Sequence, residues 1–474
     1  MRCLHSSFSY FFLVAVVLCG GGCRLVESLV LLTPPGSHYG YYDDSRNDLF
    51  DFYADFYRAT TLVGEPVVFV VTKGARPGVD EGSYKELVKR LEDHHHHNST
   101  DSLSSSSSSF KDIVWLAWLD DIWVRDFFPT QLNDQTVAKF QYSPAYLDVI
   151  TVGYINSATT RLLSSWEFPG LMDYNDLVMD GGGIVLDPDN SMAVLTERIL
   201  RDNPFLAGRP LDETGLGPSS SCCLDDPYGL LLQHNNSNNV WFTDEEIAIG
   251  EATLASLLGY DTVAIVPEEP SAPRLGHIDG LCNWLAPGVL ALSNFSNPSH
   301  YQEYQELLQE KLGDTVTIVP FPYVITNDAY FDGFESAFGI YVNFLRTKQA
   351  LYLPVFGGKN SSSSNSNNPQ QQEQQERYGA FDELALEIAR NYSDLPVVPV
   401  DASRVAIMGG SVRCLSQHLW GSTNADYLLQ KVAAARAKDE NNESASTSAA
   451  AAIVRLSPWQ QLGSLVVAMV GFLF

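Results

Sequence analysis

The sequence predicts an α/β protein. Short apolar segments of strand length alternate with longer segments of helical periodicity, and the two kinds are mixed along the chain instead of being segregated. The chain has 474 residues, of which 45% are hydrophobic, so it is long enough to bury a sizeable core.

The predicted elements follow in chain order. Residues 67–71 (VVFVV) and 113–119 (IVWLAWL) have the composition of buried strands, and residues 84–91 between them have helical character. Thr243, with Glu246 three residues later, forms a capping-box pattern that predicts a helix ending at Leu258. The later predicted elements repeat the alternation: strand 262–266, helix 301–312, strand 315–319, a strand pair at 341–345 and 350–355, helix 381–390 and strand 397–400.

The charge balance is strongly acidic. Asp and Glu number 57 against 29 Lys and Arg, which gives a formal net charge of −28. Proteins that bind nucleic acid need basic patches, so this balance argues against a nucleic-acid partner. An acidic protein favours cationic ligands, although a solvated acidic surface explains the charge equally well.

Both ends of the chain resemble processing signals. Arg2, the apolar run 10–18 and the glycines at 20–22 predict a signal peptide over residues 1–23, because the run is too short to span a membrane. In the tail 437–474, small residues at 444–448 and a terminal apolar run at 463–474 predict a GPI-attachment signal; a terminal amphipathic or buried helix is the alternative. We therefore expect an extracellular or cell-surface protein that meets the membrane only through such an anchor.

Sequons fit an exported glycoprotein. They begin at Asn98, Asn235, Asn294, Asn360, Asn391 and Asn442. Residues 30–436 remain as one domain, with low-complexity inserts at 94–109 and 357–376 that we expect to be solvated loops. The four histidines of the first insert lack a framework of other ligands, so we predict no metal site there.

Four segments place polar residues beside apolar runs. They are 118–130 (WLDDIWVRDFFPT), 179–184 (MDGGGI), 276–280 (GHIDG) and 409–418 (GGSVRCLSQH). Each has a purely structural interpretation: a glycine loop, an ion pair between Arg125 and Asp126, a satisfied polar pair, or a cysteine that fills space in the core. In an extended segment, His277 and Asp279 would share one face.

Together the four segments indicate a shared chemistry. A cysteine is a good nucleophile only as a thiolate, which nearby cations or hydrogen-bond donors favour, so Cys414 needs such neighbours. His277 can donate and accept a proton. Asp126 and Asp279 are natural partners of a planar cation with forked N–H donors. The combination predicts attack by sulfur on the central carbon of a guanidinium group.

The motif order Trp-x-Arg-Asp-x-x-Pro, Asp-Gly-Gly, Gly-His-x-Asp and Gly-Gly-x-x-x-Cys-x-x-Gln resembles the agmatine deiminase and Porphyromonas-type peptidylarginine deiminase family, over about residues 120–418. The resemblance implies a five-bladed, pseudosymmetric α/β propeller (pentein) of ββαβ-type units, and a deiminase domain at 30–436. It also implies hydrolysis of a guanidinium to a ureido group and ammonia, with no metal or organic cofactor.

The resemblance also implies a role for each site residue. Cys414 would attack the carbon, His277 would protonate the leaving ammonia and then activate water, and Asp126 and Asp279 would clamp the guanidinium. Asp121 and Asp180 fall on acidic positions of the motifs and are supporting candidates for substrate binding.

The sequence departs from the family pattern at three positions. Phe128 replaces the usual Gly, Gly183 replaces the common Asn, and Arg413 replaces a frequent His. The resemblance leaves two substrates: peptidyl-arginine, or agmatine, whose deimination leads to putrescine. The predicted export signals favour peptidyl-arginine. The alternatives are a surface-anchored guanidine-binding protein without turnover and an amidinotransferase.

Overall fold

The computed structural model describes most of the chain between Ser28 and residue 434. The described residues are 28–35, 42, 44–73, 87–91, 113–117, 121–144, 146–165, 167–189, 191–209, 242–268, 276–324, 330–331, 334–357, 369–421 and 424–434. The predicted signal peptide, the C-terminal tail, the insert at 94–109 and most of the sequons lie outside these residues. The described part mixes strands and helices throughout, which confirms the α/β class.

The recurring unit has two antiparallel strands, a helix, and a third strand parallel to the second. In one unit β4 pairs with β5 antiparallel, and β5 pairs with β6 in parallel after the crossover helix α5. A crossover of helical length is what a parallel connection requires. The bounds are β4 (Thr130–Gln131), β5 (Val137–Gln141), α5 (Val149–Ser165) and β6 (Leu171–Val178).

Three further units repeat this order. They are β7 (Ile184–Leu186), β8 (Met192–Thr196), α7 (Asp244–Leu258) and β9 (Thr262–Val266); β10 (Cys282–Ala286), β11 (Val289–Ser293), α8 (Pro298–Leu312) and β12 (Thr317–Phe321); and β15 (Leu345–Arg346), β16 (Leu351–Val355), α9 (Pro369–Tyr392) and β17 (Val397–Asp401).

The fifth such sheet joins the two ends of the described chain. Its strand order is β18-β1-β2-β3, with β18 antiparallel to β1 and with β2 parallel to β1 after α2. The bounds are β1 (Ser28–Leu32), α2 (Arg46–Val63), β2 (Val67–Lys73), β3 (Ile113–Ala117) and β18 (Ser416–Trp420). The short strands β13 (Tyr330–Phe331) and β14 (Phe334–Glu335) form a separate hairpin.

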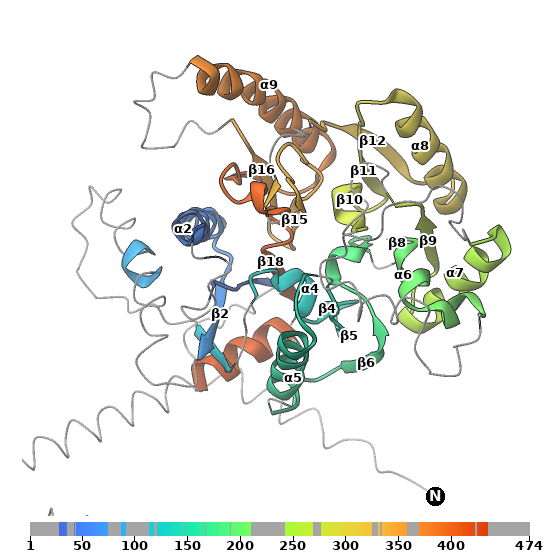
Figure 1. Cartoon of the computed structure of the whole chain (residues 1–474), viewed down its shortest axis with the longest axis horizontal. Coiled ribbons are helices and arrows are strands. Elements are labelled where there is room, and N and C mark those ends of the chain that lie inside the picture. Colours follow the sequence, from blue (N-terminus) through green and yellow to red (C-terminus); the bar gives the residue numbers. More distant parts are fainter. Residues whose placement is uncertain are drawn as a thin grey trace, which may run out of the picture.

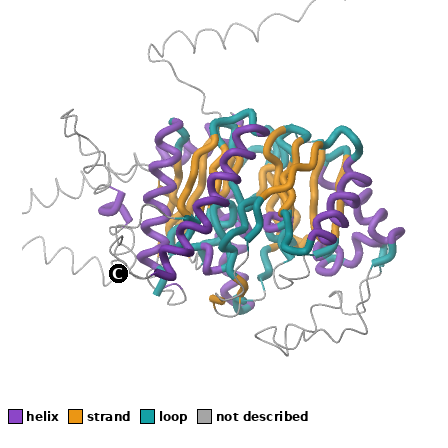
Figure 2. Tube along the Cα trace, turned by 90° about the horizontal axis from the view of Figure 1, so that it is seen from above, coloured by secondary structure: helices purple, strands orange, loops and turns teal. Residues whose placement is uncertain are grey.

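Helices cover the outside of the molecule and the sheets lie inside. Figure 1 places α5, α7, α8 and α9 at the periphery, and Figure 2 shows strands packed between helices. The largest buried apolar cluster includes side chains from α2, β16 and α9, which shows how a helix seals a sheet. Within the described residues, no helix is both long and apolar enough to cross a membrane.

The capping box of α7 is confirmed. The Thr243 side chain accepts from the Glu246 backbone N–H at 3.2 Å, and the Glu246 carboxylate accepts from the Thr243 backbone N–H at 2.8 Å. These reciprocal bonds satisfy two of the unpaired N–H groups at the helix start. The C-cap residue Gly259 has φ 77°, a left-handed conformation that glycine adopts without the steric strain of a Cβ.

Three predicted features are wrong in detail. Helix α9 begins at Pro369, so the last part of the insert 357–376 is helical; its run of Gln and Glu has good helix propensity, and Pro suits a first turn. The predicted strand at 341–345 shrinks to β15 at Leu345–Arg346. Residues 278–280 form the 3-10 turn η4 (Ile278–Gly280), so His277 and Asp279 do not lie on an extended strand.

Candidate active site

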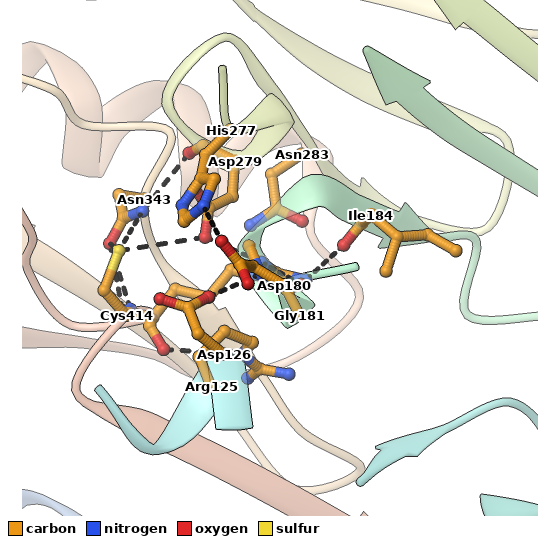
Figure 3. Close-up of polar contacts among 12 residues, drawn as sticks. Arg125, Asp126, Asp180, Gly181, Ile184, His277, Asp279, Asn283, Asn343 and Cys414 are labelled. Atoms are coloured by element: carbon orange, nitrogen blue, oxygen red, sulfur yellow. Dashed lines mark hydrogen bonds and ion pairs between the residues drawn. The ribbon is translucent and has the colours of Figure 1, made fainter. Parts of the chain in front are cut away.

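The predicted site residues precede the inner strands of different sheets. Asp126 lies in α4 (Val124–Phe127) before β4, and Asp180 lies at the start of the turn η2 (Gly181–Gly183) before β7. His277 and Asp279 lie in the η4 segment before β10, and Cys414 lies just before β18. The fold therefore brings residues far apart in sequence to one place, as Figure 3 shows.

Cys414 is a free, buried thiol held by Asn343. The Asn343 amide Nδ2 donates to Cys414 Sγ at 3.2 Å, and Asp279 Oδ2 lies 3.8 Å from the same sulfur. Burial raises the pKa of the Cys414 thiol well above its usual value, and the nearby Asp279 and Asp126 raise it further. Before a substrate cation enters the pocket, Cys414 is therefore a neutral thiol.

His277 is paired with Asp180. The distance from His277 Nε2 to Asp180 Oδ2 is 3.3 Å. Burial opposes a charged ring, but Asp126, Asp180 and Asp279 outweigh it and raise the pKa of His277 to about 9. At neutral pH the ring is therefore an imidazolium that can donate a proton.

Asp126 is fixed by the glycine turn. The Gly182 N–H donates to Asp126 Oδ1 at 2.8 Å. Burial raises the pKa of Asp126 to about 7, although His277 acts in the opposite direction. Glycine is required at 182 because a Cβ would lie 2.5 Å from His277 Nδ1 and 2.9 Å from Asp126 Oδ1.

Asp279 is engaged by Arg413 inside the protein. Arg413 Nη1 lies 2.7 Å from Asp279 Oδ2, and both side chains are almost fully buried. Arg413 also donates from Nη2 to the carbonyl of Ile184 at 2.7 Å. The residue that replaces the family's frequent His therefore holds one oxygen of a predicted clamp residue.

Asp121 lies behind the pocket wall, not in the pocket. Its carboxylate accepts hydrogen bonds from the hydroxyls of Tyr42, Tyr142 and Tyr146 at 2.9, 2.6 and 3.0 Å. The residue is 1% exposed and orients the three tyrosines. In this arrangement Asp121 supports the wall, so its predicted substrate contact would be indirect.

The groups converge on one pocket with about 500 Å³ of empty space, part of it open to solvent. Asp126, Asp180, His277 and Cys414 line this pocket, whereas Asp279 does not. The rest of the wall is mainly aromatic or apolar: Tyr42, Trp123, Tyr142, Pro144, Tyr146 and Met408, with Gly409. Such a pocket suits a ligand with a polar cationic end and an aliphatic stem. Among the described residues, no cluster of His, Cys, Asp or Glu is placed to hold a metal ion.

Two of the three departures lie away from this wall. Phe128 is 4% exposed and packs in an apolar cluster with Phe127 and Tyr142. A Cβ at position 183 would have no neighbouring atom closer than 3.8 Å, so the space beside Gly183 is open to a side chain. Arg413 contacts the side chain of a predicted site residue, Asp279, whereas the Gly183 N–H donates to the backbone carbonyl of Asp180 at 2.9 Å.

Asn343 is a site residue that the motifs did not reveal. Besides its bond to sulfur, its Oδ1 accepts from the Arg413 N–H at 3.1 Å and from Ser411 Oγ at 3.0 Å. It is 3% exposed and lies two residues before β15. In the sequence, the only indication of this residue is a single amide inside the apolar run YVNFL, and that run has the composition of a strand.

Comparison with known proteins gives one family and a shared fold. Residues 230–419 match the model of the family described as Porphyromonas-type peptidyl-arginine deiminase. No curated protein sequence matches the chain.

Three solved structures show the extent of the likeness. The agmatine deiminase of Enterococcus faecalis is 14% identical, covers 84% of this chain and 94% of its own, and has a TM-score of 0.52. The C. jejuni agmatine deiminase is 14% identical over 83% and 93%, with a TM-score of 0.51. The putative arginine deiminase from Porphyromonas gingivalis is 16% identical over 84% and 97%, with a TM-score of 0.51.

Identities this low establish a common fold alone. The range matched by the family model includes His277, Asp279, Asn343 and Cys414 but not Asp126 or Asp180. The resemblance indicated by the four motifs is thereby confirmed: residues 230–419 match the family model described as Porphyromonas-type peptidyl-arginine deiminase, and the chain shares the fold of solved agmatine deiminases.

Proposed function

We propose that this protein is a deiminase that hydrolyses the guanidinium group of an arginine-type substrate to a ureido group and ammonia, through a covalent bond to Cys414. The observation that carries the proposal is the convergence of a thiol, an imidazolium and carboxylates on one pocket: Cys414, His277, Asp126 and Asp180 line it, and Asp279 lies 3.8 Å from the sulfur. A guanidinium cation complements this combination of groups.

The first half of the reaction would form the covalent intermediate. A guanidinium held by Asp126 brings positive charge next to Sγ, which opposes the burial and the acids that raise the pKa of Cys414. The thiol proton can pass to water in the partly open pocket, and the sulfur electron pair forms the C–S bond. His277, charged at neutral pH, donates its proton to the departing nitrogen as the C–N bond breaks, and ammonia leaves.

The second half would release the product. His277, now neutral, accepts a proton from water as the oxygen attacks the S-alkylthiouronium carbon. The C–S bond then breaks, and the sulfur takes the remaining hydroxyl proton, which leaves a neutral ureido product and the Cys414 thiol. Asp180 holds the ring of His277 in both halves. Asp279 can offer its second oxygen to the substrate while Arg413 keeps Oδ2.

The residues of the pocket wall limit which arginine-type substrates the site can bind. Free arginine carries a carboxylate, and the described lining residues include no Lys or Arg to pair with it. Peptidyl-arginine and agmatine lack that carboxylate. We favour peptidyl-arginine because the matched family model describes peptidyl-arginine deiminases and because the predicted export signals imply contact with extracellular proteins.

The finer structural and cellular predictions belong to this proposal. The five sheets of three or four strands would be the blades of a pentein propeller around the pocket. The protein would be secreted through residues 1–23 and held at the cell surface by a GPI anchor added in the tail 437–474. Release from intact cells by a phosphatidylinositol-specific phospholipase C would test the anchor, and retention after treatment would contradict it.

The decisive experiment is a substrate panel with ammonia release as readout. Agmatine, free arginine and an amide-blocked peptidyl-arginine are compared with the purified protein and with Cys414→Ala. We expect a preference for the blocked arginine of about 100-fold, which corresponds to about 2.7 kcal/mol of transition-state binding. Ammonia release from none of them, or unchanged turnover in Cys414→Ala, would overturn the proposal. Transfer of the amidino group without ammonia would identify an amidinotransferase instead.

A further inference from the structure

A second pocket lies among the inner strands of the five sheets. It has about 670 Å³ of empty space, part of it open to solvent. Its lining comes from the first strand of every unit: β4, β7, β10, β15 and β18 contribute Gln131, Leu186, Trp284, Arg346 and His418 among others. Figure 1 shows β4, β10, β15 and β18 near the centre of the molecule.

This pocket is distinct from the candidate active site although the two are close. No residue lines both. Neighbours in the chain are divided between them: Asp126 and Cys414 line the active-site pocket, whereas Arg125 and Arg413 line the second one. The chain passes from one pocket to the other at these two places.

Positive charge predominates in the second pocket. Arg125, Arg346, Lys348 and Arg413 line it, against the single carboxylate of Asp187. The whole chain has a net charge of −28, so this pocket differs from the chain average in the sign of its charge. A local excess of cations attracts anionic ligands.

Two of these cations have no carboxylate partner among the described residues. Arg125 is 4% exposed, and its polar partners are the Gln417 side-chain oxygen and the carbonyl of Arg413 at 3.4 Å. Lys348 lies over the Trp420 ring at 5.4 Å. Asp279 and Asp126 act on Arg125 only from a distance. A buried guanidinium without a direct ion pair is costly, so an anion beside it would stabilise the protein.

Three lining residues also hold buried polar atoms that lack a hydrogen-bond partner in the described structure. These atoms are Thr130 Oγ1, Trp284 Nε1 and His418 Nδ1. Thr130 and Trp284 are 4% and 1% exposed. Unsatisfied buried polar groups are rare in native proteins, and the indole N–H can only donate, so each of these atoms needs an acceptor or another polar partner.

We propose that this second pocket binds a small oxyanion, a phosphate or a carboxylate, between Arg125 and Lys348 and beside the unpartnered polar atoms of Thr130, Trp284 and His418. Oxyanions accept several hydrogen bonds at once and pair with guanidinium groups in two-point geometry, which fits both the charge and the unused donors. The assignment does not depend on the proposed deiminase reaction, because none of these groups contacts Cys414 Sγ in the structure.

Isothermal titration calorimetry tests the proposal. The probes are inorganic phosphate and acetate, each added at constant ionic strength to the full-length protein, and the two arms distinguish a phosphate from a carboxylate ligand. We expect at least one anion to bind at a single site with a Kd of about 1 mM or tighter. The same binding is expected in Cys414→Ala, which separates this site from the active-site pocket.

Two variants and one control locate the binding. Thr130→Val keeps the side-chain shape and removes one unpartnered hydroxyl, and Lys348→Gln removes an exposed cation. Each is expected to weaken binding about 5- to 10-fold, the effect of one charge-assisted or buried hydrogen bond. Lys89→Gln, at an exposed lysine on another part of the chain, should bind as the parent does.

Three outcomes would overturn the proposal. One is no binding heat with either anion, which would mean that the pocket holds solvent only. The others are equal weakening by Lys89→Gln and Lys348→Gln, which would show non-specific charge attraction, and parental affinity in both Thr130→Val and Lys348→Gln.

Discussion

Replacing Asn343 with Ala should reduce the reactivity of Cys414 directly. The Asn343 amide donates to Sγ at 3.2 Å, and this bond lowers the pKa of a thiol that burial raises. A hydrogen bond to a charged group contributes about 1.5–3 kcal/mol. If the bond is made to the thiolate, kcat/KM should fall about 10- to 100-fold in Asn343→Ala. Asn343→Asp keeps the shape but places an acid beside the sulfur, so its loss should be larger.

The assay measures the thiol as well as turnover. The rate of alkylation of Cys414 by iodoacetamide, followed by peptide mass spectrometry across pH, reports the thiolate fraction without needing a substrate. We expect the pH midpoint of alkylation to move upward in Asn343→Ala, since a donor that favours the charged form is lost.

The matched control is Asn283→Ala. Asn283 is also a buried amide; its Nδ2 donates to the carbonyls of Val342 and Phe344 at 3.1 and 2.9 Å, on either side of Asn343. Both substitutions leave buried partners unsatisfied, so both should lower the free energy of unfolding by about 1–3 kcal/mol. Only Asn343→Ala should change alkylation. A parental alkylation profile in Asn343→Ala, or the same shift in Asn283→Ala, would refute the reasoning.

Three further predictions concern pH, close packing and the capping box. The plot of kcat/KM against pH should rise through about 7, as Asp126 loses its proton and can pair with the guanidinium, and fall above about 9, as His277 loses the proton it donates. Gly182→Ala should lower kcat/KM at least about 10-fold, because its Cβ displaces His277 and Asp126. Thr243→Ala should lower the free energy of unfolding by about 1 kcal/mol in chemical denaturation, with Thr243→Ser close to the parent.

A specific result would contradict each of these three predictions. A pH profile without an alkaline fall would remove His277 as the proton donor. For the packing prediction, the control is Gly183→Ala, where the nearest atom lies 3.8 Å from the new Cβ; equal losses in the two glycine variants would count against close approach as the cause. An unfolding curve of Thr243→Ala that overlays the parent would mean that the capping bonds contribute nothing measurable.

The sequence was informative where a local pattern determines a local structure. The Thr243–Glu246 spacing identified the start of α7, and apolar runs identified β2, β9 and β16 because buried parallel strands are continuously hydrophobic. The four motifs supplied the thiol, the imidazole and the acids of one pocket. The roles of those residues stay predictions.

Where the sequence failed, long-range contacts decided the structure. Asn343 lies in an apolar run that looks like a strand, and only its packing against the Cys414 segment reveals it as a hydrogen-bond donor to sulfur. The ion pair of Arg413 with Asp279 joins segments that are 134 residues apart, so no local pattern could show it. The separation of Asp121 from the pocket likewise depends on tyrosines from two distant segments.

The pairing of β1 with β18 has a consequence for synthesis on the ribosome. The first described strand, β1, can pair early with β2, but its antiparallel partner β18 is the last strand to be made. Strand β18 begins two residues beyond Cys414. A nascent chain that has emerged as far as η4 already contains Asp126, Asp180 and His277, but it has neither the nucleophile nor the strand that completes the sheet. The nucleophile and the closing strand thus emerge together late in translation, and a chain that terminates before Cys414 carries no nucleophile.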